Sequence, residues 1–142
     1  MGGDRWRGLE VWRLADDLAF DVYVATREFP REETYGLTPQ LRRAALSVPT
    51  NIVEGYSRKG KKELIHFLNV SLGSLAETKY LLHFAARLGY GDSEKLGQLE
   101  AGYDRLGQRL WRFYEAVKAG AGKARSPSQR PNVPTSQRVE TK

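Results

Sequence analysis

Hydrophobic side chains in this chain of 142 residues recur at alternating steps of three and four, and this periodicity limits the fold more than any other feature. Such spacing puts the apolar residues on one face of an α-helix. The clearest case is a heptad pattern formed by Leu96, Leu99, Tyr103, Leu106, Leu110, Phe113 and Val117. It predicts a long helix whose apolar face packs on neighbouring helices.

Two earlier stretches predict helices whose ends are marked by prolines. Helical spacing over residues 11–29 ends at Pro30, because the residue before a proline is pushed out of the α-helical region. The second helix should begin with Thr38 as its N-cap and Pro39 at the first helical position, where a missing N–H costs nothing. Pro49 removes one hydrogen bond from this helix, so we expect a kink there.

A third helix, expected over residues 64–88, carries two apolar stripes instead of one. The first stripe comprises Leu64, Leu68, Ser71, Leu75, Thr78, Leu82 and Ala85, and the second comprises Phe67, Val70, Ser74, Leu81, Phe84 and Leu88. So wide an apolar face indicates burial against something beyond the chain's own core. Gly89 can close this helix in a left-handed C-cap, and Asp92 or Ser93 can cap the next one.

These patterns predict an all-α fold for residues 1–119, an up-down antiparallel four-helix bundle with a kinked second helix. Residues 120–142 are rich in Gly, Ala, Ser, Pro, Gln and Arg, and we expect this basic tail to be disordered when alone. No apolar run approaches the roughly 18 residues of a membrane span, and no signal peptide is recognised. We therefore expect a cytoplasmic protein without membrane contact.

The sequence lacks the residues or motifs that several kinds of catalytic and metal site require. Without cysteine there is no disulfide, no cysteine-based zinc site and no thiol nucleophile. Glu63 and His66 have the Glu-x-x-His spacing of di-iron bundles, but His83 is the only other histidine, so one chain cannot complete such a site. No phosphate-binding loop, dinucleotide fingerprint or nucleophile motif occurs. We expect no enzyme activity, no cofactor and no metal.

A polar group follows the proline of the second expected helix. Asn51 and Glu54 lie three residues apart just after Pro49, so both can face the same neighbour, and Gly55 follows directly. They could form a polar site. In the structural alternative, Asn51 satisfies backbone groups that the kink exposes, while Glu54 pairs with Arg58 at i+4.

The net charge of +6 is unevenly distributed along the chain. Residues 31–63 hold seven basic side chains against four acidic ones, and residues 120–142 hold five against one. The candidate phosphate ligands are Arg42, Arg43, Arg58, Lys59, Lys61 and Lys62, with Lys123, Arg125 and Arg130 in the tail. They could bind nucleic acid or form a solvated polar face. The rings that could stack on bases, or belong to a core or an interface, are Trp6, Trp12, Tyr56, Trp111 and Tyr114.

Short strings along residues 9–117 resemble a known protein family. They are Leu9-Glu10-Val11-Trp12, Phe29-Pro30, Tyr35-Gly36-Leu37-Thr38, Gln40-Leu41-Arg42-Arg43-Ala44-Ala45, Ser47-Val48-Pro49-Thr50-Asn51-Ile52-Val53-Glu54-Gly55 and Gly73-Ser74-Leu75. The chain resembles the four-helix-bundle proteins encoded in intervening sequences of bacterial large-subunit ribosomal RNA genes. That resemblance implies a ring-like homopentamer. A related branch, the accessory variability determinants of diversity-generating retroelements, binds RNA and DNA and partners a reverse transcriptase.

The charge and the resemblance together lead to one functional hypothesis. We expect a non-enzymatic, oligomeric accessory protein that binds RNA or DNA and partners a reverse transcriptase. The alternative is a structural or protein-interaction scaffold of the same family, whose charge only keeps a ring soluble. A metal-dependent bundle enzyme is a third hypothesis, against which the two histidines argue.

Overall fold

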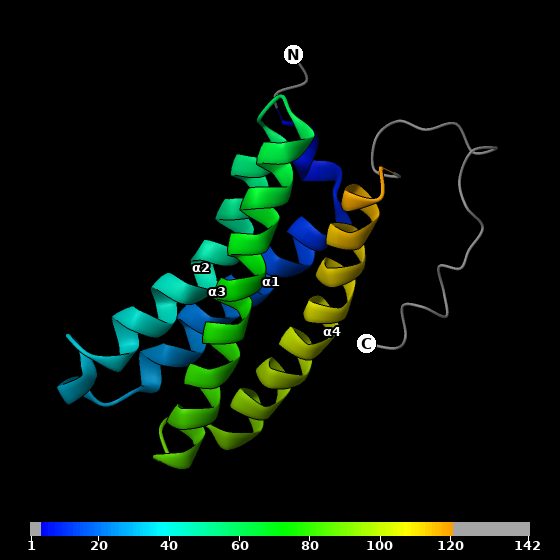
Figure 1. Cartoon of the computed structure of the whole chain (residues 1–142). Coiled ribbons are helices and arrows are strands. Elements are labelled where there is room, and N and C mark those ends of the chain that lie inside the picture. The colour runs from blue at the N-terminus through cyan, green and yellow to red at the C-terminus, as the bar shows by residue number, and fades with distance from the viewer. Residues whose placement is uncertain (1–3, 121–142) are drawn as a thin grey trace.

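The computed structural model describes residues 4–120, and this part of the chain contains four long α-helices and no strand (Figure 1). The helices are α1 (Glu10–Ala25), α2 (Leu37–Tyr56), α3 (Lys61–Arg87) and α4 (Ser93–Lys118). Three short 3₁₀ turns are η1 (Arg5–Gly8), η2 (Thr26–Glu28) and η3 (Arg31–Glu33). The helices pack antiparallel, which confirms the expected all-α four-helix architecture.

The connection between α1 and α2 differs from the sequence expectation. The α-helix ends at Ala25, four residues before Phe29, and η2 completes the stretch that the apolar spacing had assigned to one helix. The spacing continues because Phe29 is still buried in the core although its backbone is extended. The Thr26 hydroxyl donates a hydrogen bond to the Val22 carbonyl at 2.9 Å. The C-terminal end of α1 is therefore stabilised by the residue that directly follows it.

The predicted N-cap at Thr38 is wrong, because α2 begins at Leu37, two residues before the expected first position Pro39, and Gly36 is its N-cap. The Oε1 atom of Glu33 accepts a hydrogen bond from the Leu37 amide at 2.8 Å and takes the role expected of the threonine. The Glu33 Oε2 atom accepts a second bond, at 2.8 Å, from the Tyr90 hydroxyl. These bonds, that of the Leu37 amide first, hold the pKa of Glu33 below its ordinary value.

The turn between α3 and α4 agrees with the expectation. Gly89 has a φ of 77°, a left-handed conformation that glycine adopts without steric cost. The Oδ1 atom of Asp92 accepts from the amides of Glu94 and Lys95 at 2.9 and 3.2 Å, which confirms Asp92 as the N-cap of α4. Local side-chain chemistry alone predicted both ends of this turn.

Helix α2 continues without a break through Pro49, which is buried. The kink itself stays a prediction. Two residues along, the Asn51 side-chain amide donates to the Ser47 carbonyl at 2.8 Å and to the Ser47 hydroxyl at 2.9 Å. The amide therefore bonds a backbone carbonyl of its own helix. The carbonyl that Pro49 leaves without its helical donor is that of Ala45, so the role of Asn51 at a kink stays a prediction.

Helices α2 and α3 share the largest helix–helix interface, and small residues let them approach closely. A Cβ atom on Gly55 would lie 2.8 Å from the Cβ of Phe67 and 3.4 Å from the Leu64 carbonyl oxygen. Nearby, the buried Ser71 hydroxyl donates to the Val48 carbonyl at 2.8 Å, across the same interface. Two successive helices are thus held as a tight hairpin.

The core confirms the first apolar stripe of α3 and only part of the second. Six of the seven first-stripe residues are buried, and Leu64 is half-buried. In the second stripe Leu81 is buried, but Val70, Phe84 and Leu88 are exposed. These three side chains leave an apolar strip on the outside of α3 that the single chain does not cover.

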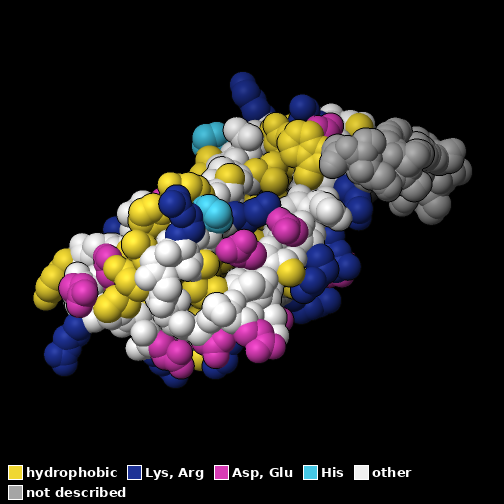
Figure 2. Space-filling model, turned by 90° about the horizontal axis from the view of Figure 1, so that it is seen from below, with side chains coloured by type: hydrophobic (Ala, Val, Ile, Leu, Met, Phe, Trp, Pro, Cys, Tyr) yellow, Lys and Arg dark blue, Asp and Glu magenta, His cyan; other side chains and the backbone are white. Residues whose placement is uncertain are grey.

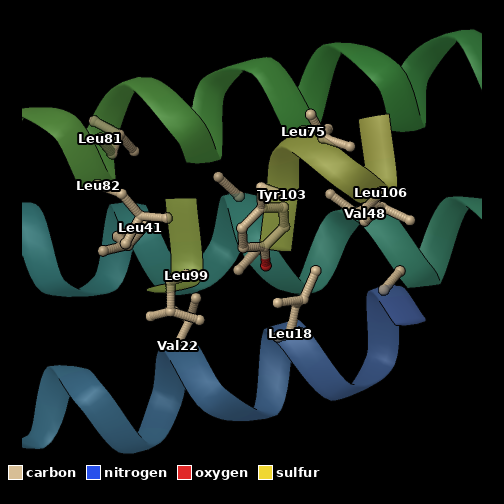
Figure 3. Packing of buried hydrophobic residues seen from close by; sticks show 14 of the residues in the cluster. Leu18, Val22, Leu41, Val48, Leu75, Leu81, Leu82, Leu99, Tyr103 and Leu106 are labelled. Carbon is tan, nitrogen blue, oxygen red and sulfur yellow. The ribbon is translucent and has the colours of Figure 1, made fainter. Parts of the chain in front are cut away.

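Tyr103 is the largest fully buried side chain of the core. Figure 3 shows its ring reaching from α4 into the space between α1, α2 and α3. Its hydroxyl has no hydrogen-bond partner within the described residues. Burial, with a smaller contribution from the charge of Asp21, raises the pKa of Tyr103 above the ordinary value of 10.0.

Replacing Gly55 with alanine should lower the free energy of unfolding by about 1–3 kcal/mol, because the added methyl group forces α2 and α3 apart. Gly97→Ala is the matched control, since nothing lies within 4 Å of a Cβ at this exposed position of α4. It should raise the free energy of unfolding by about 0.5–1 kcal/mol. Chemical denaturation of both variants measures whether the free energy of unfolding falls or rises in each. A stabilised Gly55→Ala protein would contradict the close contact.

The Tyr103→Phe variant should be more stable by about 1 kcal/mol, because it removes an unpaired buried hydroxyl. The folded state keeps the Tyr103 proton at pH values where the unfolded chain loses it, so the stability of the parent protein should fall as the pH rises above 10.0. The phenylalanine variant lacks this loss. Urea denaturation at neutral and alkaline pH should show its advantage growing with pH, and a constant difference would count against the raised pKa.

Candidate nucleic-acid interface

The structure separates the predicted basic residues into two groups at opposite ends of α2. Arg58, Lys59, Lys61 and Lys62 lie at the turn that joins α2 to α3, at the end of the molecule where the chain begins (Figure 1). Arg42 and Arg43 lie near the start of α2. Fifteen residues separate Arg43 from Arg58, which corresponds to about 22 Å along the helix axis. They do not form one continuous patch.

We call Arg5, Arg58, Lys59, Lys61 and Lys62 the basic tip. All five side chains are exposed. Arg58 pairs with Glu54 at 2.7 Å, as the structural alternative predicted, and its guanidinium lies 5.3 Å from the centre of the Phe67 ring. In the part of the chain that the structure describes, no carboxylate lies within 4.0 Å of the three lysines. Their charges are therefore available to a ligand.

The turn η1 adds cationic and aromatic groups to the basic tip. The Arg5 guanidinium lies 5.5 Å from the centre of the Tyr56 ring, which places η1 against the end of α2. Trp6 and Trp12 meet edge to face at 4.8 Å, and Arg7 lies 4.6 Å over the Trp6 ring. Sequence reasoning named these rings but missed both arginines.

A signal for Arg5 and Arg7 was present in the sequence. The string Arg5-Trp6-Arg7 alternates basic and aromatic side chains, a composition typical of surfaces that bind single-stranded nucleic acid. Arg7 is partly neutralised by Asp4, 3.4 Å away. The net charge of residues 1–30 did not indicate Arg5 and Arg7 as candidates, because this segment is acidic as a whole.

Arg42 stabilises the fold and is half-buried. Its Nε atom donates to the Thr26 hydroxyl at 2.7 Å, and one terminal nitrogen donates to the Tyr23 carbonyl at 3.1 Å. Its guanidinium also lies 4.8 Å from the centre of the Tyr23 ring. Arg42 therefore ties the start of α2 to the end of α1. Its neighbour Arg43 is exposed and makes no such contact with the residues that the structure describes.

The remaining candidates lie elsewhere. Lys123, Arg125 and Arg130 fall outside the described residues. Of the residues grouped with Pro49, Asn51 bonds within its own helix, Glu54 pairs with Arg58, and Gly55 packs against α3. This group supports the helix hairpin beneath the basic tip.

His66 and His83 are both exposed on α3. Within residues 4–120, no three histidine, aspartate or glutamate side chains come together in a group that could hold a metal ion. Among the same residues no helix is long and apolar enough to span a membrane.

Comparison with known proteins identifies the family. The family model described as "23S rRNA-intervening sequence protein" matches residues 7–112, from η1 into the last turns of α4. The chain belongs to this family. The resemblance seen in the sequence is thereby confirmed for the intervening-sequence family, and the match includes the basic tip except Arg5.

A solved structure that matches this chain shares its fold. It is a protein of unknown function from the S23 ribosomal protein family of Bacteroides thetaiotaomicron, with a TM-score of 0.67 and 20% sequence identity. The match covers 74% of this chain and 95% of that one. At this identity the likeness shows the fold alone. A search of curated proteins found no match.

The two adjacent arginines of this intervening-sequence family member should respond differently to substitution. Arg42→Gln should lower the free energy of unfolding by about 1–2 kcal/mol, because it removes charge-assisted bonds to Thr26 and Tyr23. Arg43→Gln should change it by less than about 0.5 kcal/mol. Denaturant titrations of both variants test this, and equal effects would contradict the structural role of Arg42.

Proposed function

We propose that this protein is a non-enzymatic, oligomeric accessory factor that binds RNA or single-stranded DNA through the basic tip. The observation that carries the proposal is the group of three exposed lysines without a carboxylate partner among the described residues, beside aromatic rings. Lysine and arginine contacts to phosphates supply most of the affinity in sequence-independent binding. Rings such as Tyr56 and Trp6 can stack on unpaired bases.

Helix α3 adds a favourable field at the basic tip. Its N-cap is Gly60, which provides no side-chain cap, and Lys61 and Lys62 occupy the first turn. The first amide groups of a helix lack intrahelical acceptors, and the helix dipole favours an anion at this end. A phosphate beside these lysines would meet both charged side chains and backbone donors. Glu63, also in the first turn, opposes part of this attraction.

An oligomer would multiply the effect of the basic tip. Val70, Phe84 and Leu88 leave apolar area exposed on α3, and Tyr80 nearby is 59% exposed. Covering this strip with a second copy would bury it, which supports self-association. In a ring-like homopentamer five chains of charge +6 would carry +30, a strong field for a polyanion.

The family resemblance gives the proposal its cellular context. In the retroelement branch the natural partner would be a reverse transcriptase that copies an RNA template, and a basic ring could hold that template. The rival function is a scaffold without nucleic-acid contact, and the uncovered strip on α3 is the observation in its favour. The two differ in one property, because only the first requires affinity for nucleic acid.

Changing Lys59, Lys61 and Lys62 to glutamine together should weaken binding to unstructured RNA and single-stranded DNA. Each lost phosphate contact should reduce the slope of log affinity against log salt concentration by about 0.7, or about 2 in total. Fluorescence anisotropy at several salt concentrations measures the slope. Light scattering checks that the oligomer mass is unchanged.

The matched control removes the same charge from exposed positions away from the basic tip, with Arg87, Lys95 and Arg105 changed to glutamine. This control should keep most of the affinity for nucleic acid. Its affinity should depend more steeply on salt concentration than that of the lysine variant. Equal loss in both variants would mean that net charge alone drives binding. If the parent protein binds neither RNA nor single-stranded DNA at low salt, the nucleic-acid function is wrong and the scaffold function is favoured.

A further inference from the structure

An open groove lies at the other end of α2, between the end of α1, the turns η2 and η3, and the start of α2. It has a volume of ≈ 520 Å³, within the range of small-molecule sites. Its lining residues are Tyr23, Thr26, Arg27, Phe29, Pro30, Arg31, Thr34, Thr38, Pro39, Arg42 and Arg43. Four of these eleven are arginines and none is acidic.

The charge balance of the groove favours an anion. Arg27, Arg31 and Arg43 are exposed, and in the described part of the chain none of the four arginines has a carboxylate within 4.0 Å. Glu33, which lies on η3, is engaged with Leu37 and Tyr90 and does not line the groove. On the face of the molecule seen from below, basic, acidic and apolar side chains are interspersed (Figure 2).

The guanidinium of Arg42 is held in one position in the wall of the groove. Its bonds to Thr26 and Tyr23 use the Nε atom and one terminal nitrogen and hold the guanidinium in place at the groove wall. The other terminal nitrogen makes no hydrogen bond within the described residues. A donor held in position loses less conformational entropy when a ligand arrives than a free surface arginine does.

We propose that this arginine groove binds the terminal phosphate of a nucleotide. Guanidinium forks match phosphate oxygens in a bidentate way. A terminal phosphate carries a charge of about −1.5 to −2 near neutral pH, whereas a phosphodiester carries only one, so a groove lined by four arginines suits the terminal group better. Phe29, Pro30 and Pro39 give the groove apolar walls beside the cations.

The ligand can come from two sources, a free nucleotide or the phosphorylated end of a strand. The groove lies about 22 Å along α2 from the basic tip. The groove's specificity for a terminal phosphate is independent of the proposed function, because the free nucleotide requires no binding at the basic tip.

Calorimetric titration of the full-length protein with ADP, AMP and adenosine tests the proposal. ADP should bind most tightly and adenosine not at all. Arg27→Gln combined with Arg31→Gln should weaken ADP binding by at least about tenfold, since the loss of one charged hydrogen bond is already worth about that much. Arg42 stays unchanged because it holds the fold. The control, Lys95→Gln with Arg105→Gln, removes the same charge from exposed positions outside both sites and should leave ADP affinity unaltered.

Two oligonucleotides of one sequence, with and without a 5′ phosphate, separate the sources. A preference for the phosphorylated strand that disappears in the Arg27/Arg31 variant assigns the groove to strand ends. ADP binding without such a preference assigns it to free nucleotides. Absence of both ADP binding and the preference for the phosphorylated strand, or equal loss in the variant and its control, overturns the proposed phosphate site. A basic tip that binds no nucleic acid would show separately, as unchanged strand affinity in the Lys59/Lys61/Lys62 variant.

Discussion

At Gly55 the backbones of α2 and α3 approach so closely that a single methyl group would lie 2.8 Å from the Cβ of Phe67. This contact makes the two helices a hairpin, and it fixes where the hairpin's turn projects. The Ser71 bond to the Val48 carbonyl reinforces the interface further along. A polar bond across a buried interface is favourable only when both groups meet at the right distance, so it adds geometric specificity to the packing.

The position of both charged sites follows from the hairpin. Close packing at Gly55 supports the turn that carries Arg58 and the lysines, while Arg42 anchors the other end of α2 to α1. A rigid helix of 20 residues therefore keeps the basic tip and the arginine groove apart. Neither site needs a catalytic group. The chemistry we propose for both is the attraction of positive charges for phosphate, which depends strongly on salt.

The sequence predicts much of the fold because burial follows the helical period. The heptad of α4 and the Asp92 cap depend on residues that are near one another along the chain, so their spacing was sufficient. The prediction of Thr38 as N-cap failed because the side chain of Glu33, from the preceding turn, accepts the hydrogen bond of the first amide of α2. A capping residue cannot be chosen by identity alone when another acceptor reaches the first amides.

The candidate site was harder to predict because its geometry is set by contacts between distant segments. Arg42 and Arg43 are neighbours in the sequence, yet Arg42 bonds to α1 while Arg43 stays exposed. Arg5 belongs to the basic tip through its contact with Tyr56, 51 residues away. Charge counts along the chain detect neither arrangement, since side-chain direction depends on which helix lies opposite.

Mapping where nucleic acid touches the protein tests the central claim most directly. Ultraviolet irradiation of the protein with RNA, followed by mass spectrometry of the linked peptides, identifies the contacting aromatic residues. The account predicts cross-links at Tyr56 and Trp6, beside the lysines of the basic tip. Cross-links that spare both residues, in a complex that forms at low salt, would contradict it.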